Sequence, residues 1–202
     1  MNEGEKSMNF PRTLQAALEK LLSGMRQEDM IRDAQAISGR YREQSGLGRR
    51  LVTLHSQAAA YAASRMPATF GAVCAALSKA LASLEREPRT LLDAGAGTGA
   101  AAWAADAILP LENVLCLERE DAMRNIGQTL MQAGSPVLQN AVWLSRDLCA
   151  GTGNERAELV IMAYVLGEMA EGDRAAAVQK LWDASETMFL IVEPGTPKGY
   201  AT

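Results

Sequence analysis

A glycine-rich turn preceded by an aspartate is the part of the sequence best suited to chemistry. The stretch 90-TLLDAGAGTGAAAWAA-105 carries Gly95, Gly97 and Gly99 at alternate positions, with Asp93 two residues before the first of them. Glycines after a strand let the backbone approach a ligand closely, and a following helix offers free N–H groups to an anion. With Ala100, the spacing fits the G-x-G-x-x-G/A turn of dinucleotide-binding proteins.

The same residues equally fit D-x-G-x-G-x-G, the pattern of methyltransferases, and Asp93 favours this second reading. Beside a pyrophosphate, its carboxylate would add repulsion. S-adenosylmethionine has no phosphate, and its ammonium and sulfonium groups attract a carboxylate, while helix N–H groups can donate to its own carboxylate.

Two further acids follow later apolar runs, where this cofactor needs them. Glu118 ends the second run and can accept both ribose hydroxyls, and Asp147, with Leu148 beside it, follows the third run and can accept from the adenine amino group. Each acid alone is weak, because an acid after a strand is often a helix cap. In order, each after its own strand, they predict S-adenosylmethionine ahead of a dinucleotide.

After Pro88, short apolar runs alternate with helix-like segments, and these elements must position the candidate residues. Apolar runs cover 90–94, 113–118, 139–145, 158–164 and 187–193. Helix-like segments cover 98–109, 120–133 and 171–185. Near-continuous apolar strands alternating with helices indicate a parallel sheet covered on both faces. We therefore predict an α/β, Rossmann-like methyltransferase fold with strand order 3-2-1-4-5.

The residues before Pro88 show helical periodicity and no convincing strand. Predicted helices cover 12–23, 27–43, about 50–65, and a fourth with Pro67 in its first turn that continues to about residue 84. The chain thus divides into a helical cap region, 1–86, and an S-adenosylmethionine-binding Rossmann-like domain, 87–202.

Charge is divided unevenly between these two parts. Residues 1–88 carry 12 Lys and Arg against 9 Asp and Glu, a net of +3, whereas residues 89–202 carry 8 against 15, a net of −7. The densest basic cluster is Arg40, Arg42, Arg49 and Arg50. It is the part of the chain best suited to a phosphate backbone, although such a cluster is also typical of a solvated helix end.

Several classes of protein are disfavoured. The start, MNEGEKSMNF, has no apolar region typical of a secretory signal, and the longest strongly apolar stretch, 159–167, is too short to span a membrane. Cys74, Cys116 and Cys149 have no C-x-x-C spacing, which predicts reduced thiols in a cytoplasmic protein and no metal site.

Five segments carry a family resemblance: 61-YAASRMPATFGAV-73, 91-LLDAGAGTGAAAWAA-105, 115-LCLEREDAM-123, 159-LVIMAYVLGEM-169 and 192-VEPGTPKGY-200. The chain resembles the ribosomal small-subunit-associated methyltransferase-like family of bacteria and mitochondria. R-M-P-A-T and E-P-G-T-P are its specific segments. The resemblance implies a methyltransferase linked to ribosomal RNA or small-subunit assembly, with the small subunit or its RNA as partner.

The sequence departs from that family after E-P-G-T-P. Family members continue with further strands and a cysteine-rich segment that can hold an iron–sulfur cluster, whereas this sequence stops at Thr202. We expect a C-terminally shortened domain without the sixth and seventh strands, with the fifth strand at a sheet edge. No metal site is carried over.

Candidates for direct catalysis are Tyr164, Glu168 and Glu193, which fall near the expected acceptor. Methyltransferases that act on exocyclic amines of bases often carry an N/D-P-P-Y/F motif after the fourth strand, and this motif is missing around Tyr164. Positioning alone can nevertheless promote methyl transfer to an acceptor that is already nucleophilic. Packing, solvation and capping are the alternative roles of these three residues. Residues expected to close over the cofactor are Tyr61, Arg65 and Thr69, with Arg65 facing its carboxylate.

Three functions follow from this reading. The first is methylation of ribosomal RNA or of a target bound to the small subunit. The second is a non-catalytic assembly factor that retains the cofactor pocket, and the third is a small-molecule methyltransferase.

Overall fold

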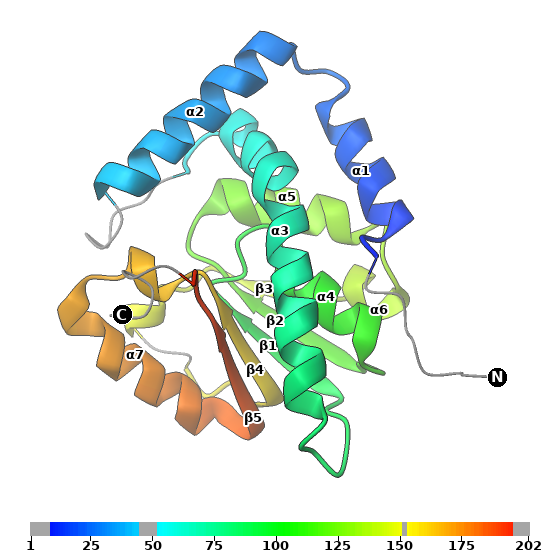
Figure 1. The fold of residues 1–202 in the computed structure, drawn as a ribbon, viewed down its shortest axis with the longest axis vertical. Helices are drawn as coiled ribbons and strands as arrows, with labels where there is room; N and C mark the ends of the chain where they lie inside the picture. Colours follow the sequence, from blue (N-terminus) through cyan, green and yellow to red (C-terminus); the bar gives the residue numbers. More distant parts are fainter. Residues whose placement is uncertain (1–8, 45–51, 151–152, 196–202) are drawn as a thin grey trace.

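A five-stranded parallel sheet forms the centre of the protein (Figure 1). The computed structural model describes residues 9–44, 52–150 and 153–195. The strands are β1 Thr90–Ala94, β2 Asn113–Leu117, β3 Val142–Leu144, β4 Ala157–Ala163 and β5 Ser185–Val192. Their order, β3-β2-β1-β4-β5, confirms the order predicted from the sequence.

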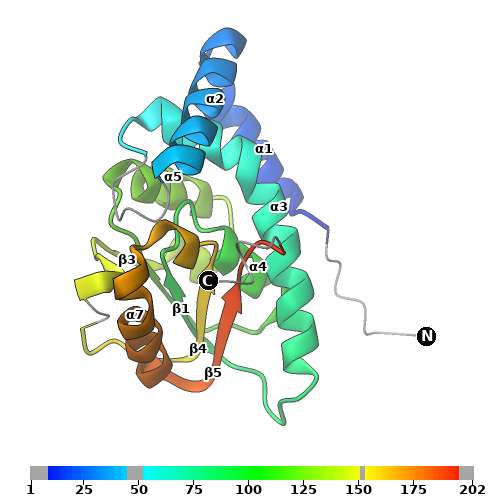
Figure 2. The same cartoon turned by 60° about the vertical axis from the view of Figure 1, so that its left-hand side comes forward.

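Helices cover both faces of this sheet. They are α1 Arg12–Leu22, α2 Gln27–Gln44, α3 His55–Leu81, α4 Ala100–Ile108, α5 Asp121–Met131, α6 Pro136–Gln139 and α7 Glu171–Ala184, with 3-10 turns η1 Leu148–Ala150 and η2 Leu166–Glu168. Figure 2 shows α3 and α4 on one face and α7 on the other. In the same views α1 and α2 form an arch that stands away from the strands.

Successive residues of the central strand serve two separate cores, because side chains alternate between the faces of a sheet. Leu91 belongs to the core that contains Phe70 of α3, whereas Leu92 packs in a second core with Met162 of β4 and Leu181 of α7. Burial on both faces explains why the apolar runs of β1 and β4 are continuous rather than alternating.

Helix α3 is one continuous element, so the two helices predicted around Pro67 are wrong. Proline inside a helix costs about 3 kcal/mol because it removes one hydrogen bond and clashes with the preceding turn. Here the proline itself is exposed, while one buried stripe continues on both sides of it. The stripe consists of Ala59, Ala62, Met66, Phe70, Val73 and Leu77. Its burial outweighs the cost of the proline.

The third strand is shorter than the predicted run of 139–145, since its first residue belongs to α6. Ser135 caps this short helix by accepting the Leu138 N–H through its hydroxyl at 3.4 Å, and Pro136 occupies the first helical position. These two residues start a helix where the apolar pattern suggested a strand. As a result β3 contributes only three residues to the edge of the sheet.

The helical region and the sheet share a core. Leu14 of α1, Phe70 and Leu77 of α3 and Leu91 of β1 all belong to the same buried cluster. The boundary between residues 86 and 87 therefore marks a change of secondary structure, and its use as a domain boundary stays a prediction. Within the described ranges, no helix is long and apolar enough to span a membrane.

Candidate functional site

The glycine turn lies at the carboxyl end of β1 and is fastened to the neighbouring strand. The N–H groups of Gly95 and Ala96 both donate to the Leu117 carbonyl, at 2.9 Å each. Gly95 adopts a φ of +74°, in the left-handed region that side-chain-bearing residues rarely occupy. A Cβ at Gly95 would lie 2.6 Å from Cγ2 of Val165, so both backbone conformation and space require glycine there.

Asp93 lies at the base of this turn with its side chain buried. Its Oδ2 accepts the Ala102 N–H of α4 at 3.1 Å, so the carboxylate caps the helix that follows the turn. Burial raises the pKa of Asp93 to about 7, and the nearby Glu118 adds to the rise, while the Ala102 amide opposes it. If Asp93 contacts a ligand as predicted, it does so with a carboxyl group that already accepts one backbone N–H.

Glu118 follows β2 and holds the turn from the opposite side. Its Oε2 accepts the Gly97 N–H and its Oε1 accepts the Glu120 N–H, both at 2.8 Å. Arg124 donates to the Glu118 backbone carbonyl at 3.0 Å, which fixes the residue further. Burial raises the pKa of Glu118, although the Glu120, Gly97 and Arg119 amides and the Arg119 guanidinium partly offset that effect.

Asp147 follows β3 and is the most open of the three acids, with its side chain 47% exposed. Its Oδ1 accepts the Cys149 N–H at 2.9 Å, and its Oδ2 lies 3.4 Å from Nη1 of Arg119. Burial alone would raise the pKa of Asp147, but the Cys149 amide and the Arg119 charge outweigh it and lower the pKa. Asp147 is thus an ionised acceptor at neutral pH.

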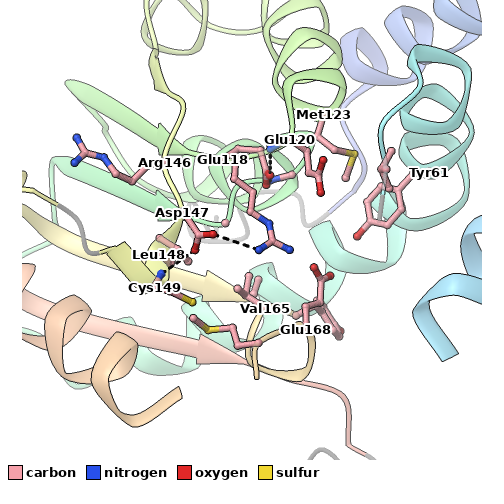
Figure 3. Close-up of a pocket in the computed structure, with 17 residues that line it drawn as sticks. Tyr61, Glu118, Glu120, Met123, Arg146, Asp147, Leu148, Cys149, Val165 and Glu168 are labelled. Atoms are coloured by element: carbon pink, nitrogen blue, oxygen red, sulfur yellow. Dashed lines mark hydrogen bonds and ion pairs between the residues drawn. The ribbon is translucent and has the colours of Figure 1, made fainter. Parts of the chain in front are cut away.

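A pocket at the carboxyl ends of the strands brings most of the predicted cofactor residues together (Figure 3). Its lining includes Gly95, Gly97, Glu118, Asp147 and Leu148. The pocket is open to solvent, and the space between its walls and in its mouth together is about 750 Å³. Ligands of open α/β sheets bind at this edge.

A second hollow lies on the α3 side of the glycine turn and shares part of its wall with the main pocket. Asp93 lines this hollow and does not line the main pocket. Tyr61 lines both, and Thr69 lines the second, whereas Arg65 is exposed and lines neither. Two of the three residues predicted to close over the cofactor, Tyr61 and Thr69, therefore line the hollows. Gly99, the remaining predicted turn residue, is the N-cap of α4 and lies outside both linings.

The three catalytic candidates occupy different surroundings. Tyr164 directly follows β4, lines both hollows, and has a φ of +62°, the one positive value among non-glycine residues in the described ranges. Glu168 lines the main pocket, where Figure 3 shows its carboxyl group directed toward the interior. Glu193 accepts the Leu166 N–H at 2.9 Å and lies outside both linings. Tyr164 and Glu168 stay as catalytic candidates, and Glu193 fastens the η2 turn to the end of β5.

The predicted RNA-binding arginines are only partly described. Arg40 lies half-buried in α2. Arg42 belongs to the same helix, but its side chain is outside the described part of the structure, as are Arg49 and Arg50 altogether. Their role in binding remains a prediction.

Sequence reasoning missed several residues that line the main pocket. Arg119 and Glu120 directly follow Glu118, so their place after β2 was a signal available in the sequence. Met123 and Val165 gave no such signal, because an apolar residue near a strand end usually reads as core. Across the described residues, no three His, Cys, Asp or Glu side chains gather as a metal site would require.

Comparison with known protein families gives a match over most of the chain. Residues 55–202 match the family described as "Mitochondrial small ribosomal subunit Rsm22". A curated relative, "Ribosome assembly protein METTL17, mitochondrial" from Homo sapiens, is 30% identical over 149 residues, which cover 70% of this chain and 32% of the relative. The chain thus spans about a third of that relative's length.

Comparison with solved structures identifies methyltransferase folds. The plantazolicin methyltransferase BpumL in complex with SAH has a TM-score of 0.55 at 12% identity, over 88% of this chain and 61% of that one. A structure described as the "DhpI-SAM-HEP complex" has a TM-score of 0.54 at 20% identity, over 71% of this chain and 64% of that one. At such identities the likeness concerns the fold alone.

Proposed function

Because the chain belongs to the Rsm22 family of the mitochondrial small ribosomal subunit, we propose that it is an S-adenosylmethionine-dependent methyltransferase acting on ribosomal RNA or on a target bound to the small subunit. The observation that carries the proposal is the arrangement of Glu118 and Asp147 around one pocket beside the glycine turn. The proposal places the protein where small subunits are assembled. The human relative is named as a mitochondrial protein.

The donors and acceptors in the pocket fit this cofactor. A carboxylate has about four acceptor sites, and the Gly97, Glu120 and Arg119 amides occupy three of those on Glu118, so it keeps capacity for a ribose hydroxyl. Asp147 is ionised and exposed enough to accept from an adenine amino group. Asp93, in the adjoining hollow, is available to an ammonium group.

S-adenosylmethionine supplies an electrophilic methyl group when bound. The contribution of the chain is then to hold an acceptor in line with that group and to exclude water. Tyr164 and Glu168 both line the pocket and are the residues we assign to this task. The N–H of Tyr164 donates to the Val192 carbonyl at 2.8 Å, so this side chain is presented from a fixed backbone.

A second function, a non-catalytic assembly factor that retains the pocket, is favoured by one specific observation. Asp93, Glu118 and Asp147 each accept a backbone N–H, so all three contribute to folding the strand ends whether or not catalysis occurs. The human relative is itself named an assembly protein. Ligand binding without methyl transfer would support this function.

Calorimetric titration of the chain with S-adenosylmethionine and separately with NAD tests the cofactor. We expect saturable binding of S-adenosylmethionine and none of NAD, because the Asp93 carboxylate would repel a pyrophosphate. Transfer of a labelled methyl group to small-subunit RNA or particles then separates the two functions. Binding of NAD alone would overturn the proposal.

RNA should contact the helical region if the substrate is ribosomal. Replacing Arg40, Arg42, Arg49 and Arg50 together by alanine is expected to weaken RNA binding at low salt. Each lost phosphate contact should reduce the slope of log affinity against log salt by somewhat under about one unit. A matched variant replaces Arg26 and Arg32, which are exposed but paired with Asp29 in the same helical region. Equal RNA affinity of the quadruple variant and the wild type would show that the cluster is only a solvated surface.

A further inference from the structure

Arg119 contacts both acids of the main pocket. It follows Glu118 directly after β2, and it lines the pocket itself. Its backbone N–H donates to the Glu118 carboxylate. Nη1 of its guanidinium lies 3.4 Å from Oδ2 of Asp147, which follows β3. One residue therefore reaches Glu118 through its main chain and Asp147 through its side chain.

The backbone on both sides of this ion pair is held in register. The Glu118 N–H donates to the Leu144 carbonyl at 3.1 Å, and the Arg146 N–H donates to the Glu118 carbonyl at 3.4 Å. The Arg119 side chain is 22% exposed, whereas that of Asp147 is 47% exposed. Arg119 is thus the more constrained partner of the pair.

Hydrogen bonds, more than packing, orient the half-exposed Asp147 carboxylate (Figure 3). Cys149 donates its backbone N–H to Oδ1 at 2.9 Å and also contributes its thiol, while Arg119 lies beside Oδ2. These partners use three of about four acceptor sites, which leaves one for a ligand. Without the guanidinium, Oδ2 would lose its partner and the carboxylate could rotate. Arg119 therefore determines where the remaining acceptor site points.

We propose that Arg119 is a positioning residue that aims the Asp147 carboxylate at the purine of the bound cofactor and thereby selects adenine over hypoxanthine. The inference rests on the proposed binding of S-adenosylmethionine. Adenine carries an amino group at the position where hypoxanthine carries a carbonyl. An oriented carboxylate accepts a hydrogen bond from the amino group and repels the carbonyl oxygen.

Calorimetric titration of the full chain with S-adenosylhomocysteine and with S-inosylhomocysteine measures this selection. The wild type should bind the adenine ligand about tenfold more tightly or better, because the hypoxanthine ligand leaves the Asp147 acceptor unpaired. Arg119→Met should reduce that preference about three- to fivefold, the effect of one partly exposed ion pair. The ratio of the two affinities is the readout, since a general loss of stability lowers both affinities alike.

Two controls separate positioning from a structural role. Nε of Arg156 lies 3.4 Å from Oε1 of Glu186, the same separation as in the Arg119 pair, but neither residue lines the main pocket. Arg156→Met should leave the base preference unchanged. The preference for ribose over 2′-deoxyribose should persist in Arg119→Met, because Arg119 contacts the Glu118 carboxylate through a backbone N–H that the substitution keeps.

The outcomes distinguish this inference from the proposed function. Equal base preference in the wild type and Arg119→Met would overturn the inference and leave the cofactor assignment standing. A higher preference in the variant would show that the guanidinium binds the hypoxanthine carbonyl, and would also overturn it.

A milder variant decides the matter if Arg119→Met binds neither ligand. Arg119→Lys keeps the charge and loses the planar guanidinium, so its base preference should fall by less. A preference as high as that of the wild type would then overturn the inference. Failure of the wild type to bind S-adenosylmethionine and S-adenosylhomocysteine would overturn both the inference and the proposed function.

Discussion

Glu118→Ala is expected to weaken S-adenosylmethionine binding by about 1–3 kcal/mol, measured by calorimetric titration, through the loss of charge-assisted hydrogen bonds to the ribose. The same substitution leaves the Gly97 and Glu120 N–H groups without their acceptor. We therefore expect the free energy of unfolding to fall as well, by about 1–3 kcal/mol per amide that stays buried and unpaired.

Two further variants separate these effects. Glu118→Gln keeps the size of the side chain and one carbonyl acceptor, so it should retain more stability than alanine while still losing affinity. Glu112→Ala removes an exposed acid that pairs with Arg89 before β2, and it should change neither quantity measurably. Unchanged affinity in Glu118→Ala would remove Glu118 from the site.

Gly95→Ala is expected to lower the free energy of unfolding by about 2–4 kcal/mol, measured by urea denaturation. A Cβ there is strained at a φ of +74° and would lie 2.6 Å from Cγ2 of Val165. Because Val165 lines the pocket, its displacement should also weaken cofactor binding.

Gly71→Ala is the matched control, since Gly71 lies within α3 and a Cβ there would meet nothing within 4 Å. Alanine should stabilise that helix position by about 0.5–1 kcal/mol relative to glycine. Similar stability of the two variants would show that the turn tolerates a side chain at position 95.

The sheet was predictable because each of its strands left a separate signal. Burial of β1 and β4 on both faces produces continuous apolar runs, and parallel strands place their carboxyl ends at one edge. The acids that follow β2 and β3 therefore had to converge on the turn after β1. Of the three predicted acids, Glu118 and Asp147 line the main pocket, whereas Asp93 accepts the Ala102 N–H and lines the adjoining hollow.

Other features depend on tertiary contacts that a linear pattern does not contain. Pro67 alone predicts the start of a helix. In the structure α3 continues through it, because the residues on both sides of the proline are buried on one face. Glu193 is predicted to lie near the methyl acceptor, yet its carboxylate accepts the Leu166 N–H. The partner of Glu193 lies 27 positions away along the chain, and the continuity of α3 is decided by a whole packed face.

The left-handed backbone of Tyr164 bears on how this chain could be improved as a protein reagent. A tyrosine in that conformation costs of order 1–3 kcal/mol, whereas glycine or asparagine adopts it readily. An engineer selecting for thermal resistance alone would thus be drawn to this position. The gain would come at the junction of the two hollows, where the phenol forms part of both walls. Selection for thermal stability therefore favours replacing Tyr164, whereas ligand recognition favours keeping it.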